Sequence, residues 1–195
     1  DMTSCEVLPA PLSALLVPLR RLVESLSCPD RIPQIEVSVG ADVTVLVFRT
    51  LVPLVDEDKR QLRAFSDLHK IAVWLQPQGP ETAHPFHPMD GPALDYTLPE
   101  YGVRIGFLPT DFTQVNHAIN ASLVRRAMGL LDPTPGELIY DLFCGLGNFS
   151  LPMARLGARV VGYEGSAGLV KRARENARRN GLEPDFRSAN LSQPS

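Results

Sequence analysis

The sequence predicts an α/β protein in which a parallel βαβ unit follows a smaller α+β domain. Three observations lead to this prediction. The apolar run at residues 138–140 and the segment Arg159–Tyr163 are both typical of strands, and an acidic residue follows each of them. Between them lie a turn with two glycines and a helix-length segment that Gly157 closes. Before residue 110, alternating strand patterns and amphipathic helix patterns predict a separate α+β arrangement.

The first domain is expected over residues 1–109. Leucines at helical spacing predict one amphipathic helix over residues 11–27, bent at Pro18 because proline lacks the backbone donor. Further along, His84 and His87 lie three residues apart and are candidate metal ligands. The prolines around them and the lack of a nearby acid or thiol favour a plain loop. The remaining elements are, in order, a hairpin, a helix, a strand, this loop and a second hairpin: residues 35–47, 56–68, 71–75, 77–92 and 94–107.

The second domain is expected over residues 110–195. Asn116 or Asn120 can cap its first helix. The buried face of that helix is predicted to consist of Ile119, Leu123, Ala127 and Leu130. The elements that follow are, in order, a fully buried strand, a helix, a strand, a basic helix and a third strand: residues 138–140, 148–156, 159–163, 166–180 and 185–188.

The turn after the first of these strands carries the clearest functional signal. Gly145 and Gly147 suit a tight turn that a ligand approaches closely, since glycine adopts positive φ. A nicotinamide fingerprint would place a third glycine at position 150, where Ser150 stands, so pyrophosphate binding is disfavoured. Glu164 can accept hydrogen bonds from two ribose hydroxyls, and Asp141 can orient the turn or meet a cationic part of the ligand. This chemistry suits S-adenosylmethionine. An ordinary βαβ unit with acids that cap its loops is the alternative.

Composition and charge exclude several classes of protein. The chain has 195 residues, 44% hydrophobic and 21% charged, in the range of soluble globular proteins. No apolar run approaches the ~20 residues of a membrane span, and three unclustered cysteines favour a reducing, cytoplasmic setting. Residues 1–112 hold 9 Lys/Arg and 15 Asp/Glu (net −6), whereas residues 113–195 hold 10 and 7 (net +3). The second part would therefore present the basic face to an RNA partner.

Four motifs occur in order and together resemble the bacterial RNA uracil-5-methyltransferases. They are Phe107–Asn116, Asp141–Phe149, Val161–Gly165 and Asn176–Gly181. The resemblance is greatest to the RlmD/RumA-like group, which methylates a uridine of 23S ribosomal RNA. It implies the N-terminal part of a Rossmann-like S-adenosylmethionine-dependent methyltransferase domain, with ribosomal RNA as the partner. A transfer RNA or another ribosomal uridine as the target, and a non-catalytic RNA-binding module, are the alternatives.

The resemblance also implies which residues line the cofactor pocket: Gln114, Phe143, Asn148, Glu164 and Asn190. Methylation at carbon 5 of uracil needs a cysteine thiolate that adds to carbon 6, and a base that removes the carbon-5 proton. In the family both groups lie in the later half of the domain, so they are expected beyond Ser195 and no catalytic residue is expected in this chain. Cys144 is expected to shape the turn rather than to act as the nucleophile.

The family also carries a 4Fe-4S cluster on four cysteines. Cys5, followed by Glu-Val-Leu-Pro, matches the fourth ligand, and the other three are not in this chain. The resemblance thus implies a cluster in a longer parent, and an internal fragment in this chain. Three strands of a larger sheet are expected to leave an apolar face exposed and to favour self-association.

Overall fold

The computed structural model describes residues 2–91 and 93–192. Contacts divide the chain into two compact units, the first comprising residues 1–38 and 43–92 and the second residues 39–42 and 93–195. By these contacts the hairpin expected over 94–107 belongs to unit 2, whereas the predicted first domain, residues 1–109, includes it. A boundary between folding domains at residue 109 remains a prediction.

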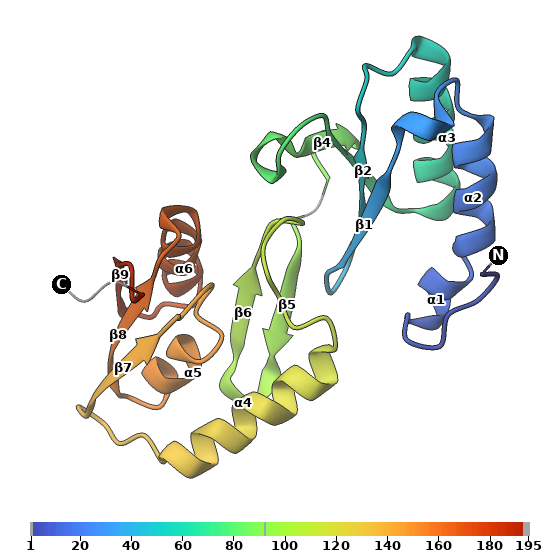
Figure 1. Cartoon of the computed structure of the whole chain (residues 1–195). Coiled ribbons are helices and arrows are strands. Elements are labelled where there is room, and N and C mark those ends of the chain that lie inside the picture. Colours follow the sequence, from blue (N-terminus) through green and yellow to red (C-terminus); the bar gives the residue numbers. More distant parts are fainter. Residues whose placement is uncertain (1, 92, 193–195) are drawn as a thin grey trace. The chain divides into compact units, whose positions relative to one another are not determined.

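Unit 1 is built on a four-stranded mixed sheet (Figure 1). The strand order is β1 (Gln34–Val39), β2 (Thr44–Arg49), β3 (Ala72–Gln76) and β4 (His84–His87). Helix α3 (Asp56–His69) connects β2 to β3, which run parallel, as the crossover helix of a βαβ unit. The core of unit 1 consists mainly of fully buried side chains: Val45, Leu46, Val47, Phe48, Leu62 and Val73.

The prediction of a single helix over residues 11–27 is wrong. The structure has two helices, α1 (Ala10–Ser13) and α2 (Leu16–Ser25). Pro18 lies in the first turn of α2, where its missing N–H would have no intrahelical partner in any case. In a continuous helix its ring would clash with the carbonyl of Ala14, four residues earlier. The chain therefore breaks at residues 14–15 instead of bending.

The prediction of a plain loop over residues 77–92 is also wrong in part, because this segment contains the strand β4. This strand pairs antiparallel with β3 at the edge of the sheet, and an edge strand tolerates Pro85. The two histidines have separate partners. His84 Nδ1 lies 2.9 Å from the Thr82 carbonyl oxygen, and His87 Nε2 lies 2.7 Å from Asp67 Oδ1.

Unit 2 confirms the predicted order of elements. An antiparallel hairpin of β5 (Asp95–Leu98) and β6 (Val103–Gly106) precedes helix α4 (His117–Leu131). A βαβαβ segment follows, with three parallel strands in the order β7–β8–β9. Its elements are β7 (Leu138–Leu142), α5 (Ser150–Arg155), β8 (Arg159–Glu164), α6 (Ala167–Arg179) and β9 (Asp185–Ser188).

Across both units, short 3₁₀ helices occur at Pro29–Arg31, Pro80–Thr82 and Pro99–Tyr101. Among the described residues, no helix has the length and hydropathy required to span a bilayer.

Within the part of the chain that the structure describes, helices cover one face of the three-stranded sheet and leave the other open. Helices α5 and α6 pack on β8 and β9 (Figure 1). On β7, Leu138, Tyr140 and Leu142 are 46–57% exposed, so the prediction of a fully buried strand is wrong. The reason is that these alternate residues share one face of the sheet, and the described residues leave that face exposed. The expectation of an exposed apolar face is confirmed.

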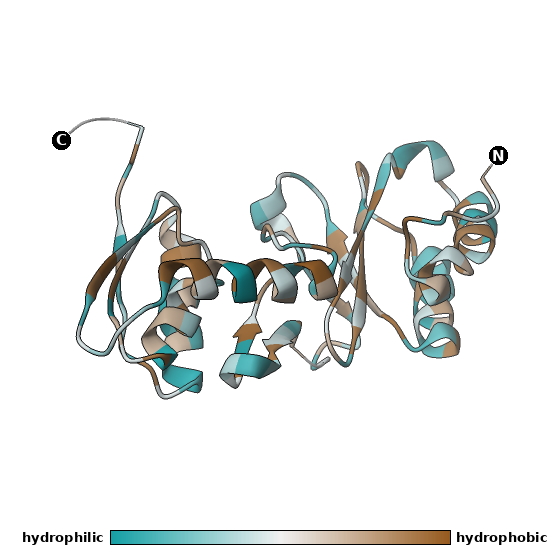
Figure 2. Cartoon of the chain, turned by 90° about the horizontal axis from the view of Figure 1, so that it is seen from below, coloured by the Kyte–Doolittle hydropathy of each residue, from teal (hydrophilic) through white to brown (hydrophobic). Residues whose placement is uncertain are grey.

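Helix α4 has the predicted cap but not the predicted buried face. Asn116 Oδ1 accepts a hydrogen bond from the Ile119 N–H at 3.0 Å. The buried residues are Asn120, Val124 and Met128, whereas Ile119, Leu123 and Leu130 are exposed. Figure 2 shows apolar and polar residues alternating along this helix. The buried stripe is therefore shifted by one residue from the one predicted.

Candidate functional site

The turn that follows β7 lies at the carboxyl end of the parallel strands and has an unusual backbone. Gly145 and Gly147 have φ of 53° and 95°, which confirms the predicted positive φ that glycine adopts without strain. Phe143 has φ of 64°, a conformation rare for a bulky residue, and its side chain is 69% exposed. An exposed aromatic ring on a strained backbone is the kind of feature that collects at ligand sites.

Glu164, at the end of β8, holds this turn. Its Oε2 accepts a hydrogen bond from the Gly145 N–H at 3.2 Å, and its Oε1 accepts one from the Ser166 N–H at 2.9 Å. The Cys144 N–H also donates to the carbonyl of Tyr163 at 2.9 Å. Each carboxylate oxygen of Glu164 keeps capacity for a further hydrogen bond, because an ionised carboxylate offers about four acceptor sites. The site thus has free acceptors beside the glycine turn.

Asp141 is held by Ser150, the residue that replaces the third glycine of a dinucleotide fingerprint. Ser150 is fully buried, and its hydroxyl donates to Asp141 Oδ2. Burial raises the pKa of the Asp141 carboxyl above its usual range, and the hydrogen bonds from Ser150 oppose this effect. Ser150 therefore links the end of β7 to the first turn of α5, a role that no local pattern in the sequence predicts.

Asn148 anchors the far end of the turn. Its Oδ1 accepts hydrogen bonds from the Tyr96 hydroxyl and from Asn120 Nδ2, each at 2.9 Å. Its Nδ2 donates to Asn120 Oδ1 at 3.0 Å, so the two amides are paired reciprocally. One N–H of the Asn148 amide remains for a ligand. Nothing in the sequence around Tyr96 indicates that it contacts Asn148. For Asn120, the one indication in the sequence is a polar residue among the apolar residues of a helix.

Gln114 and Asn190 both lie on exposed loops. Gln114 precedes α4 in a segment that Asp111 holds: Asp111 Oδ2 accepts from the Leu108 N–H at 2.8 Å, and Oδ1 pairs with Arg172 on α6. Asn190 follows β9, and its Oδ1 accepts from the Ser192 N–H at 3.1 Å. Within the described ranges, neither side chain hydrogen-bonds to the glycine turn or to Glu164. The structure brings together Glu164, Asn148 and the turn that carries Phe143.

Cys144 lies inside the turn and is 5% exposed. Burial raises the pKa of its thiol to about 12, with further contributions from the charges of Asp141 and Glu164. At neutral pH the group is therefore a thiol, and a thiol is a poor nucleophile. Its position fits a packing role under the turn.

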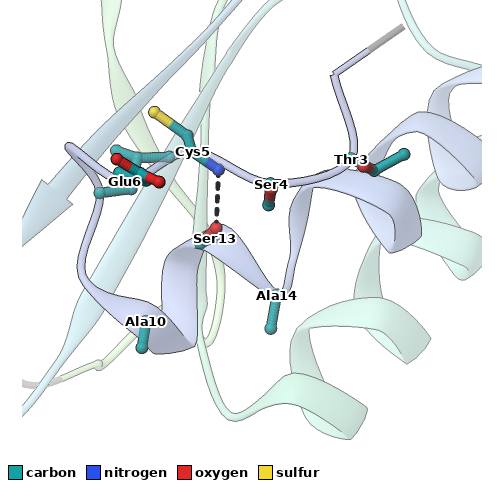
Figure 3. Close-up of a pocket in the computed structure, with 8 residues that line it drawn as sticks. Thr3, Ser4, Cys5, Glu6, Ala10, Ser13 and Ala14 are labelled. Atoms are coloured by element: carbon teal, nitrogen blue, oxygen red, sulfur yellow. Dashed lines mark hydrogen bonds between the residues drawn. The ribbon is translucent and has the colours of Figure 1, made fainter.

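Cys5 lies in unit 1, in a hollow lined by Thr3, Ser4, Glu6, Leu8, Ala10, Ser13 and Ala14 (Figure 3). Its backbone N–H donates to Ser13 Oγ at 2.8 Å, and its sulfur points away from that contact. The described residues contain no group of three or more His, Cys, Asp or Glu side chains placed to hold a metal. These residues alone therefore do not fit a four-cysteine cluster.

Comparison with known proteins gives a consistent result. A family model described as tRNA (Uracil-5-)-methyltransferase matches residues 102–190. The chain is 60% identical over 193 residues to the 23S rRNA (uracil(1939)-C(5))-methyltransferase RlmD of Nitrosospira multiformis, over 98% of the chain and 44% of the relative. It is 61% identical over 193 residues to the protein of that name from Azoarcus sp., over 98% of the chain and 45% of the relative. The chain thus spans less than half the length of these relatives.

Comparison with solved structures gives a match along the full length of this chain. The tRNA (uracil-54, C5)-methyltransferase of Pyrococcus abyssi, in complex with S-adenosyl-L-homocysteine, aligns over 100% of this chain and 50% of its own, with a TM-score of 0.69 and 18% identity. This likeness shows a shared fold and confirms the Rossmann-like fold predicted from the sequence.

Proposed function

Since the chain belongs to the RNA uracil-5-methyltransferase family, we propose that it is part of a longer protein that methylates carbon 5 of a uridine in 23S ribosomal RNA. The observation that carries this proposal is the Glu164 carboxylate beside the glycine turn at the carboxyl ends of parallel strands. This is where open α/β sheets bind nucleoside ligands.

The proposed ligand is S-adenosylmethionine, which supplies an electrophilic methyl group. Glu164 accepts hydrogen bonds from the ribose hydroxyls through its free acceptor sites. The glycines allow the backbone of the turn to approach the ligand closely, and the exposed ring of Phe143 packs against it. Asn148 donates its remaining N–H. Gln114 and Asn190 contribute polar contacts from the two neighbouring loops.

The groups that act on the uracil ring are proposed to lie outside residues 1–195. The reaction requires a thiolate that adds to carbon 6 and a base that removes the carbon-5 proton. Cys144 does not meet this requirement, because it is buried and its pKa is raised to about 12. We therefore propose that this chain binds the cofactor and that the rest of the protein supplies the nucleophile.

The partner and location follow from the same proposal. Residues 113–195 carry a net charge of +3, which favours a polyanionic partner such as ribosomal RNA. An enzyme of ribosomal RNA with free cysteines works in a reducing compartment, and we propose the cytoplasm.

The proposal is tested by transfer of a tritiated methyl group from S-adenosylmethionine to unmodified 23S ribosomal RNA. The longer protein is expected to incorporate label, and residues 1–195 alone are expected to incorporate none, because the nucleophile is missing. A transfer RNA transcript is the matched control substrate. Label in transfer RNA but not in 23S RNA would contradict the proposed substrate. Label incorporated by residues 1–195 would contradict a nucleophile outside this chain and would reopen the role of Cys144.

We also propose that Cys5 is the fourth ligand of a 4Fe-4S cluster whose other three cysteines lie elsewhere in the longer protein. Replacing Cys5 with serine in that protein, expressed without oxygen, is expected to lower the iron content and the visible absorbance, because a hydroxyl is a poor ligand for iron in such clusters. Cys28→Ser is the matched control, since Cys28 is the other partly exposed thiol of unit 1. An unchanged iron content in Cys5→Ser would make Cys5 an ordinary thiol.

A further inference from the structure

Two asparagines, Asn176 in α6 and Asn180 at its C-cap, hold the free edge of β6. Asn180 Oδ1 accepts from the Arg104 N–H at 2.8 Å, and its Nδ2 donates to the Arg104 carbonyl at 2.7 Å. One turn earlier on the helix, Asn176 Oδ1 accepts from the Gly106 N–H at 2.9 Å, and its Nδ2 donates to the Gly106 carbonyl at 3.0 Å. The two side-chain amides thus take the place of a further strand beside β6.

Asn176 makes one contact that Asn180 does not make. Its Nδ2 also donates to the carbonyl of Leu146, in the glycine turn, at 3.2 Å. Asn176 is 1% exposed, and the three hydrogen bonds of its side chain are all to backbone groups. Its own carbonyl accepts a hydrogen bond from Asn180 Nδ2 at 2.7 Å. A Cβ at Gly106 would lie 3.3 Å from Asn176 Oδ1, so the glycine permits this close approach.

The contact fixes one peptide unit of the turn at both of its polar atoms. The Leu146 carbonyl accepts from Asn176, and the N–H of the next residue, Gly147, donates to the Cys144 carbonyl at 2.9 Å. Without Asn176, the Leu146 carbonyl would lose its buried partner and this peptide could rotate. The N–H of Gly145, which contacts Glu164, lies one residue earlier in the same turn.

We propose that Asn176 is a positioning residue for the cofactor: it holds the glycine turn in the conformation that receives S-adenosylmethionine. This inference rests on the proposed function. It assigns Asn176 a role in ligand affinity that Asn180, the C-cap residue one turn later, does not have.

The test is calorimetric titration of S-adenosylmethionine into the longer protein, carried out well below the melting temperature of each variant. Asn176→Ala is expected to weaken binding by about tenfold or more, because small displacements of positioning groups have effects on this scale. Asn180→Ala is expected to lower the melting temperature through the loss of its contacts to Arg104 and to the Asn176 carbonyl. It is expected to leave the affinity within about twofold, because the Asn176 side chain and its contact to Leu146 are kept.

The outcomes are distinct. A folded Asn176→Ala protein with unchanged affinity would overturn the inference, and so would an equal loss of affinity in Asn180→Ala. If Asn176→Ala does not fold, Asn176→Ser, which keeps one hydroxyl donor, is measured in its place. If neither folds, residue 176 acts in folding and the inference is overturned. A wild-type protein that does not bind S-adenosylmethionine would instead contradict the proposed function.

Discussion

Replacing Glu164 with alanine in the longer protein is expected to weaken the binding of S-adenosylmethionine by roughly 1–3 kcal/mol, which corresponds to about 5- to 150-fold in affinity. Two effects add in the same direction. The ribose hydroxyls lose their proposed acceptor, and the Gly145 N–H loses the carboxylate that holds the turn. Calorimetry measures the affinity, and circular dichroism shows whether the variant is folded.

Two further variants sharpen this experiment. Glu164→Gln keeps the size of the side chain and one acceptor oxygen, so a smaller loss than in Glu164→Ala is expected. Glu183→Ala removes an exposed glutamate of unit 2 outside the site and is expected to leave the affinity unchanged. Full affinity in Glu164→Ala would remove Glu164 from the site and would leave the proposal without its main observation.

Introducing a methyl group at Gly162 is expected to lower the free energy of unfolding by roughly 1–3 kcal/mol. Gly162 lies in β8, the middle strand, directly under the glycine turn. A Cβ there would lie 2.6 Å from Phe186 Cδ1 and 2.9 Å from Cys144 Sγ, and both of those residues are buried. Because β8 pairs on both sides, the backbone has little room to shift.

Gly129→Ala is the matched control for Gly162→Ala. Gly129 lies in α4, and a Cβ at that position would meet nothing within 4 Å. Alanine there is expected to stabilise the helix by about 0.5–1 kcal/mol, the difference in helix propensity between the two residues. Urea unfolding followed by far-ultraviolet circular dichroism measures both variants. If Gly162→Ala unfolds at the same urea concentration as the wild type, Phe186 and Cys144 can shift to accept the methyl group without loss of stability, and the prediction is wrong.

Local features of the sequence determined the succession of elements in unit 2. The glycines of the turn, Gly157 after α5 and the Asn116 cap of α4 each act within a few residues, so a local pattern contains what is needed to predict them. The position of Glu164 at the end of β8 follows from the same local reading. For this reason the fold class and the centre of the candidate site could be predicted without coordinates.

Other features depended on the tertiary structure because their partners are distant in the sequence. Two stripes of residues on α4 have helical spacing. The buried stripe is the one that contains Asn120, Val124 and Met128, in which Asn120 pairs with Asn148, 28 residues away. The Leu146 carbonyl meets Asn176 at a separation of 30 residues, and Gly106 meets it at 70. Periodicity predicts that a helix has a buried face, but only packing selects which face it is. A buried amide is satisfied by whatever backbone group the fold brings beside it, so these contacts of the turn were decided by the tertiary structure alone.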